Sequence, residues 1–368
     1  MTTQSVRAEA EPRKTPWRAI AGVGFAIFFV LFLAVPLWDI LLAMIASPQL
    51  LARQLVIGLT NGVYIALIAL GYTLVYGIVE LINFAHGDLY MLGAFFSLTL
   101  IGLFALTPET PLEVRVPLMF LILILTMFFT AGLNVAIDRI AYRRLRGASS
   151  RLAALISAIG VSFIFQNIGL LWGYMRFIPQ LNGVMGSNAV APKSFPQLIP
   201  NQNLLEGIVP VRFTVKDLVV LVISVLLLIG LYLFVQRTKL GKAMRATAQD
   251  RNASALMGIN VDGTIALAFL LGGAFAGASG MLVGLYNGTA VFDMGFTAGL
   301  RSFTAAVLGG IGNIPGAMLG GILIGLISAL SDQYISSKWT NAVVFGILVI
   351  ILVFRPTGLL GDGSVNKV

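Results

Sequence analysis

Long apolar runs, nearly free of charge, constrain this chain more than any other feature of its sequence. A helix needs about 20 mostly apolar residues to cross the roughly 30 Å of a bilayer's hydrocarbon. Candidate runs occur at 19–38, 55–78, 89–106, 117–137, 152–174, 216–235, 263–287, 299–312, 315–334 and 340–354. Only 11% of the 368 residues are charged, against about 25% in soluble domains, and the runs lack the alternation of barrel strands. The pattern predicts an all-α polytopic membrane protein with about 8–10 transmembrane helices.

Interruptions in these runs predict one or two broken helices. The run 299–312 is short for a full crossing, and 308–321 is rich in glycine and contains Pro315. Proline and glycine both weaken the backbone hydrogen-bond ladder of a helix.

The positions of Lys and Arg predict how the chain is oriented, because these residues concentrate on the cytoplasmic side. The segment 138–151 holds five arginines, and 236–262 is also basic. Ten spans with a cytoplasmic N-terminus place both segments inside, although eight spans also fit. The chain then divides into a cytoplasmic N-terminal tail (1–18), a transmembrane domain (19–354) and a cytoplasmic C-terminal tail (355–368). The transmembrane domain includes the cytoplasmic segment 236–262 and an outer, periplasmic segment 175–215.

Composition excludes several kinds of site. The chain has no cysteine and one histidine, His86, so a zinc or haem site lacks ligands, and we expect no metal, no cofactor and no catalytic residues. The basic residues that produce the net charge of +9 lie between apolar runs. This placement indicates membrane topology rather than nucleic-acid binding. The sequence contains no Gly-Lys-Ser/Thr phosphate loop, so any ATP must be hydrolysed by another subunit.

The segment 82–94, INFAHGDLYMLGA, concentrates polar groups between two apolar runs. Ionisable groups in hydrocarbon are costly unless they face a cavity or another helix. One interpretation is a helix break that lines a solute path, with Asn83, His86, Gly87 and Asp88 as path residues. The alternative is a tight cytoplasmic turn, in which Asn83 or Asp88 caps the next helix and His86 is merely interfacial.

The segment 308–321, LGGIGNIPGAMLGG, allows two interpretations as well. Glycines at every fourth position share one face of any helical part and let two backbones approach closely. Close packing is one interpretation, and a bend that lines the path through Gly312, Asn313, Pro315 and Gly316 is the other. A second small-residue pattern, from Gly272 to Gly280, predicts another helix contact.

The basic segment 240–262 is rich in helix-forming residues, and Gly258 offers a stop. It is either an interfacial loop or a docking helix for a cytoplasmic partner. The candidate docking residues are Met244, Arg245, Asp250, Arg251, Leu256, Met257 and Gly258.

Several motifs, in a fixed order along the chain, carry a resemblance to a known family. INFAHGDLYMLGA follows NGVYIALIALGYTLVYG, and GKAMRATAQDRNASALMGIN, FTAAVLGGIGNIPGAMLGG and FRPTGLLG come later in the chain. Over about residues 51–361 the sequence resembles LivH-type permease subunits of branched-chain amino acid ABC importers.

The resemblance implies a permease domain in the bacterial inner membrane that imports branched-chain amino acids by alternating access. It also implies four kinds of partner: a second, LivM-like permease subunit, two cytoplasmic ATP-binding subunits, a periplasmic solute-binding protein and the lipid membrane. By the same resemblance, 240–262 is the coupling helix that docks on an ATPase.

Other functions stay open at this stage. Similar permeases move urea or short amides, and no residue distinguishes these substrates. An ion-coupled secondary transporter would need acids in mid-span, whereas the acids here map near span ends. An integral membrane enzyme would need a cluster of reactive groups.

Overall fold

The computed structural model describes residues 38–81, 83–143, 151–173, 188–207, 210–361 of the chain. The chain forms two compact units, Met1–Leu50 and Leu51–Val368. In the first unit, residues 38–46 are helical, and the predicted tail 1–18 and most of the predicted span 19–38 lie outside the described residues. Everything below concerns the second unit.

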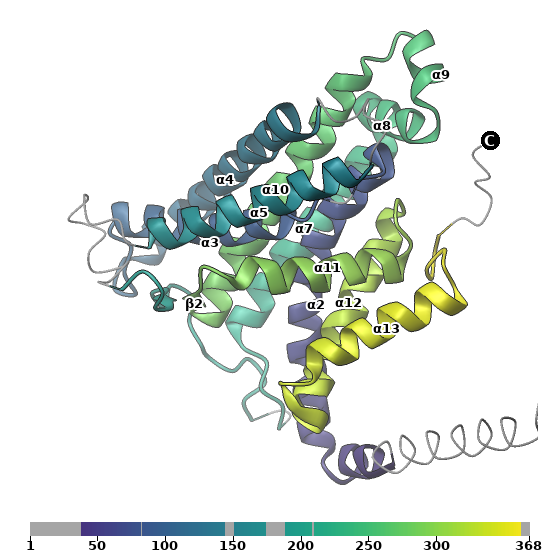
Figure 1. Ribbon diagram of the computed structural model, residues 1–368. Coiled ribbons are helices and arrows are strands. Elements are labelled where there is room, and N and C mark those ends of the chain that lie inside the picture. The colour runs from purple at the N-terminus through teal and green to yellow at the C-terminus, as the bar shows by residue number, and fades with distance from the viewer. Residues whose placement is uncertain (1–37, 82, 144–150, 174–187, 208–209, 362–368) are drawn as a thin grey trace, which may run out of the picture. The chain divides into compact units, whose positions relative to one another are not determined.

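Helices make up nearly all of this unit (Figure 1). The long ones are α2 (Pro48–Val79), α3 (His86–Leu103), α4 (Leu112–Ile137), α5 (Arg151–Trp172), α7 (Val215–Arg237), α10 (Val261–Asn287) and α12 (Ile314–Ser331). The shorter ones are α8 (Lys239–Gln249), α9 (Arg251–Leu256), α11 (Met294–Gly309) and α13 (Thr340–Phe354). Two π-helical turns, η1 (Asp138–Tyr142) and η3 (Asp332–Ser336), extend α4 and α12.

Within the described residues, seven helices are long and apolar enough to cross a membrane, and α13 is a shorter apolar helix. They match the predicted spans, which confirms an all-α polytopic membrane protein. The predicted run 299–312 lies mainly in α11, whose 16 residues fall short of the roughly 20 needed for a full crossing.

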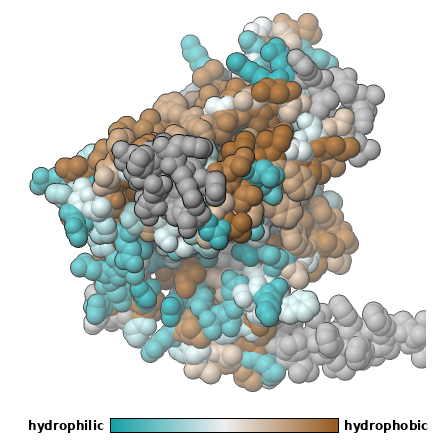
Figure 2. Space-filling view, turned by 60° about the vertical axis from the view of Figure 1, so that its left-hand side comes forward, coloured by the Kyte–Doolittle hydropathy of each residue, from teal (hydrophilic) through white to brown (hydrophobic). Residues whose placement is uncertain are grey.

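Burial separates central from peripheral helices. The apolar windows of α2, α3 and α10 are 83%, 78% and 78% buried, whereas those of α4, α5 and α7 are 22–28% buried. The peripheral helices therefore present Leu, Ile, Val and Phe side chains outward, as expected where lipid is the solvent. Figure 2 shows apolar side chains over a broad part of one face.

Small residues let α10 pack closely against α3 and α4, which confirms the contact predicted from Gly272 to Gly280. A Cβ atom on Gly273 of α10 would lie 2.6 Å from the Thr130 carbonyl oxygen of α4, and one on Gly93 of α3 would lie 2.7 Å from the Gly277 Cα. Only glycine permits backbones this close.

Two short strands form the described sheet. β1 (Lys193–Ser194) pairs antiparallel with β2 (Thr289–Ala290), with Lys193 opposite Ala290. The pairing fastens the described part of the segment 175–215 to the end of α10.

Candidate functional site

The break between α2 and α3 turns back into the helix bundle. α2 ends at Val79, and α3 begins at His86, whose ring packs edge-on against Tyr72 with centroids 4.8 Å apart. The ring occupies the space that a Cβ atom on Gly71 would need. Since Gly71 precedes Val79 by eight residues, the His86 ring lies about 12 Å along α2 from its end, at 1.5 Å per residue. The break is therefore re-entrant.

Asn83 connects this loop to two other helices through buried side chains. Its Nδ2 donates to Asn134 Oδ1 of α4 at 3.2 Å, and its Oδ1 accepts from the Tyr142 hydroxyl at 3.1 Å. Asn134 Nδ2 in turn donates to the Phe269 carbonyl oxygen of α10 at 2.6 Å. Asn83 and Asn134 are 2% and 0% exposed. Bonds between polar side chains in a membrane interior hold helices in one arrangement.

The π-helical turn η1 places Tyr142 within this network. A π turn rotates the residues that follow it relative to a regular helix, and here Tyr142 is buried with its ring near Phe269. The loop, the end of α4 and the middle of α10 thus share one buried polar connection.

Asp88 lies in the first turn of α3 and faces α5. Its Oδ2 accepts a short hydrogen bond from the Ser162 hydroxyl, to which Gln166 Nε2 also donates at 3.3 Å. Beside it, the starts of α3 and α11 touch through glycines: a Cβ atom on Gly87 would lie 2.7 Å from the Gly299 Cα. One on Gly295 would lie 2.7 Å from Asp88 Oδ1.

A cavity of about 400 Å³ opens on the other side of Ser162. It combines apolar side chains with polar ones that carry hydroxyl, amide and carboxylate groups. The lining residues are Phe84, Ile159, Ser162, Phe163, Gln166, Asp293, Phe296, Thr297 and Leu300. We name it the α5–α11 cavity.

Residues 83–86 form a tight turn, in which His86 N donates to the Asn83 carbonyl oxygen at 3.0 Å, but Asn83 and His86 are buried. No described side chain caps the first turn of α3, because Asn83 and Asp88 bond to other helices. His86 is 1% exposed rather than interfacial, and neither of its ring nitrogens makes a well-formed bond to a described residue, although the Ile68 carbonyl lies close. The structure places the polar side chains of this break against other helices, and their role in a solute path stays a prediction.

The second break lies between α11 and α12. The chain leaves α11 at Gly310 and passes through Gly312, both with positive φ (107° and 91°), so glycine is required there. Asn313 caps α12 by accepting from Gly316 N at 2.9 Å, and Pro315 occupies the first turn, where its missing N–H costs nothing. Gly312 lies before α12 and so does not share the helical face of Gly316 and Gly320.

The C-terminal segment closes this second break. Leu359 N donates to the Leu308 carbonyl oxygen at 2.8 Å, and Leu360 N donates to that of Gly309 at 2.9 Å. Carbonyl groups at the end of a helix have no partner within it, and the FRPTGLLG segment supplies the donors for α11. Asn313 Nδ2 adds a bond to the Leu360 carbonyl oxygen at 2.7 Å.

Helices α8 and α9 are fastened to the ends of two long helices. Arg245 Nη1 donates to the Val235 carbonyl oxygen of α7 at 2.6 Å, and Arg251 Nε donates to the Ile78 carbonyl oxygen of α2 at 3.0 Å. Both acceptors belong to a last helical turn, where a cation is also favoured by the helix dipole. Asp250 caps α9 through the Asn252 and Ala253 amides.

The predicted docking residues divide into two groups. Met244 is 2% exposed and lines a small pocket with Gly77 and Gly312, so it packs inside the protein and not at its surface. Arg245 and Arg251 also turn inward. Asp250, Met257 and Gly258 lie at the surface, and Leu256 and Met257 are 89% and 85% exposed.

The structure brings together some of the predicted path residues and separates others. Asn83, His86, Gly87 and Asp88 cluster at the re-entrant break, whereas Gly312, Asn313, Pro315 and Gly316 form the second break beside α8. Asn134, Tyr142, Ser162 and Gln166 were missed. Asn134 had a signal in the sequence, since an amide within an apolar run is rare; the others occur in unremarkable contexts.

The fold and this site define a multi-pass α-helical membrane protein with two interrupted elements at its centre. Residues 54–353 match the family described as "Branched-chain amino acid transport system / permease component", and the chain belongs to this family.

The similarity extends over nearly the whole of several relatives. The chain is 41% identical to the high-affinity branched-chain amino acid transport system permease protein BraD of Pseudomonas aeruginosa, over 86% of this chain and 97% of that protein. It is 38% identical to the permease proteins LivH of Salmonella typhimurium and Escherichia coli, with the same shares covered. No solved structure matches the chain.

Proposed function

We propose that this chain is a permease subunit of an ATP-driven importer that carries branched-chain amino acids across the bacterial inner membrane. The observation that carries the proposal is the similarity to BraD and LivH, which covers 97% of each relative. No observation favours urea, short amides or an ion gradient over this function.

The proposed partners are a second, LivM-like permease subunit, two cytoplasmic ATP-binding subunits and a periplasmic solute-binding protein. The exposed pair Leu256 and Met257 supports an ATPase contact at α9, because two fully exposed apolar side chains on a cytoplasmic helix suit burial in a partner's groove. Asp250 and Gly258 flank this pair at the surface.

The anchors of α8 and α9 suggest how ATPase movement reaches the membrane. A displacement of α9 pulls on the Ile78 carbonyl through Arg251, and one of α8 pulls on α7 through Arg245. Beyond Ile78 the chain enters the re-entrant loop, where Asn83 is bonded to α4 and, through Asn134, to α10. Where these helices meet through glycines, no large side chains interlock. The helices can therefore adopt two packing arrangements that differ little in free energy.

The α5–α11 cavity is the proposed part of the solute path in this subunit. Its apolar side chains suit an aliphatic side chain, while Ser162, Gln166, Thr297 and Asp293 can bond the charged ends of an amino acid. Asp88, behind Ser162, adds negative charge close to an ammonium group in that cavity. Gly87 contributes to the proposed path by letting α11 lie close to α3. His86 contributes by filling the space beside Gly71.

Uptake by the reconstituted importer tests the proposal. The chain is assembled with its partner subunits in proteoliposomes, and radiolabelled leucine uptake is measured with the binding protein outside and ATP inside. We expect uptake that requires ATP, survives dissipation of ion gradients and is not reduced by excess urea or acetamide. Uptake without the ATPase subunits, or uptake abolished by an ionophore, would contradict it.

A further inference from the structure

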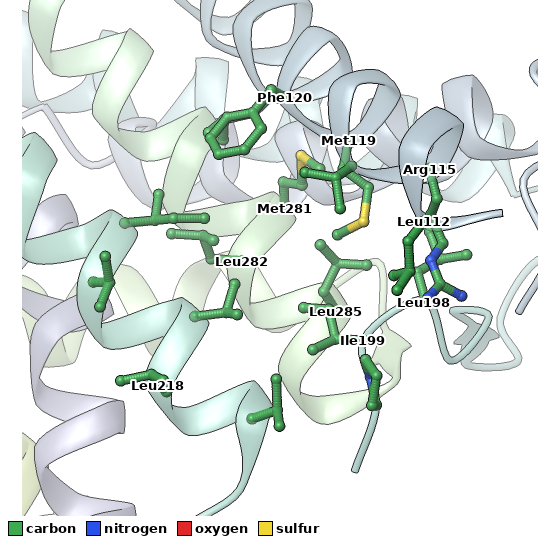
Figure 3. A pocket seen from close by; sticks show the side chains of 17 residues that line it. Leu112, Arg115, Met119, Phe120, Leu198, Ile199, Leu218, Met281, Leu282 and Leu285 are labelled. Carbon is green, nitrogen blue, oxygen red and sulfur yellow. The ribbon is translucent and has the colours of Figure 1, made fainter. Parts of the chain in front are cut away.

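A second, larger cavity lies on the outer surface of the helix bundle, away from the proposed solute path. It is a groove of about 540 Å³ between α4 and α7, with α10 as its floor and residues 198–200 at one end. Figure 3 shows Met119 of α4, Leu218 of α7, and Leu282 and Leu285 of α10 around it. We name it the α4–α7 groove. Nearly all of its surface is carbon, which suits a hydrocarbon ligand.

One cation lies at the end of this groove. Arg115 lines it and is only 7% exposed. Its Nη1 donates to the Pro108 carbonyl oxygen at 2.8 Å, but its buried Nε has no acceptor among the described residues. An anionic oxygen in the groove would pair with this cation, because a phosphate accepts charge-assisted hydrogen bonds from a guanidinium.

The dimensions of the groove fit one leaflet of a bilayer. Along α4 its lining runs from Leu112 to Leu123, which is about 16 Å at 1.5 Å per residue. Half of a hydrocarbon core of about 30 Å is about 15 Å. The Arg115 end carries residues 198–200, from the segment predicted to be periplasmic, so the charged end faces the outer interface and the apolar end points to the membrane centre.

A hydrocarbon chain attached to an anionic group matches both the apolar lining of this groove and the cation at its end.

We propose that the α4–α7 groove is a phospholipid site. One acyl chain of an outer-leaflet lipid lies between α4 and α7 over Leu282, and a phosphate oxygen of the same lipid accepts a hydrogen bond from the Arg115 guanidinium.

Lipid competition on the full importer tests this site. The complex is purified in nanodiscs that contain equal amounts of phosphatidylglycerol and of diacylglycerol with the same acyl chains, and native mass spectrometry counts the lipids it retains. The wild type should prefer phosphatidylglycerol by at least about tenfold, as expected for a charge-assisted bond. Arg115→Gln should bring the ratio close to one. Arg53→Gln, which removes an exposed cation predicted on the same side, should keep the wild-type ratio.

A second variant fills the groove, and its effect on lipid retention does not depend on Arg115. Val222 lines the groove and is half exposed, so Val222→Trp should reduce retention of both lipids several-fold. An unchanged ratio in Arg115→Gln, an equal loss in Arg53→Gln, or full lipid retention in Val222→Trp would each overturn the proposal. Release of the partner permease by Val222→Trp with no loss of lipid would overturn it too, and would identify a protein interface.

Discussion

Removing the Arg251 side chain should uncouple ATP hydrolysis from transport. Its guanidinium donates through Nε and Nη2 to the Ile78 carbonyl oxygen, and this is the contact by which α9 holds the end of α2. A net bond to a charged group is worth about 1.5–3 kcal/mol. Because Arg251 is partly exposed, we reduce this to about 1–2 kcal/mol, a factor of about 5–30.

The assay compares two rates in the same proteoliposomes, ATP hydrolysis and leucine uptake. Arg251→Gln should lower uptake per ATP hydrolysed by about 5–30-fold while hydrolysis continues. Arg251→Lys should fall in between, since an ammonium group cannot reproduce the two-donor fork.

Arg237→Gln provides the matched control, because it removes an equal charge from an exposed position near the same cytoplasmic helices. Its uptake per ATP should equal that of the wild type. The reasoning fails if Arg251→Gln leaves this ratio unchanged, or if Arg237→Gln lowers it equally.

Three further variants test other parts of the site. Asn134→Leu leaves the buried Asn83 amide without its acceptor and should cost about 1–3 kcal/mol, seen as a lower melting temperature in detergent; no change would exclude a stabilising role. Gly316→Leu places a side chain against the Gly309 backbone and should reduce uptake at least about tenfold, given the cost of overpacking, with normal membrane insertion; Gly346→Leu, at an open position, should transport normally. Met257→Asp should abolish co-purification of the ATPase subunits, and retained ATPase would place their contact elsewhere.

Residues 80–88 show where sequence and structure divide. The sequence located the break, because polar residues between two apolar runs are conspicuous. It left open whether the loop stays at the membrane surface or turns inward. That choice depends on whether Gly71 leaves room for His86, and whether Asn134 and Ser162 stand opposite Asn83 and Asp88. Those residues are 51 and 74 positions away along the chain.

Met244 also shows what a local sequence pattern leaves undecided. Its place in a basic segment rich in helix-forming residues made it a candidate docking residue, but α8 packs against α2 and α7, and this side chain is buried between them. Local pattern identifies an apolar face without saying what covers it.

The sequence alone determined that most of this protein lies in lipid, and therefore that its spans are helices. In hydrocarbon every backbone group must bond within its own segment, so apolar length and interruptions fix the spans. Only the tertiary structure decided which helices are central, where the two breaks point and how α8 and α9 hold the rest. Those outcomes depend on contacts between residues far apart in the chain, which a local pattern does not encode.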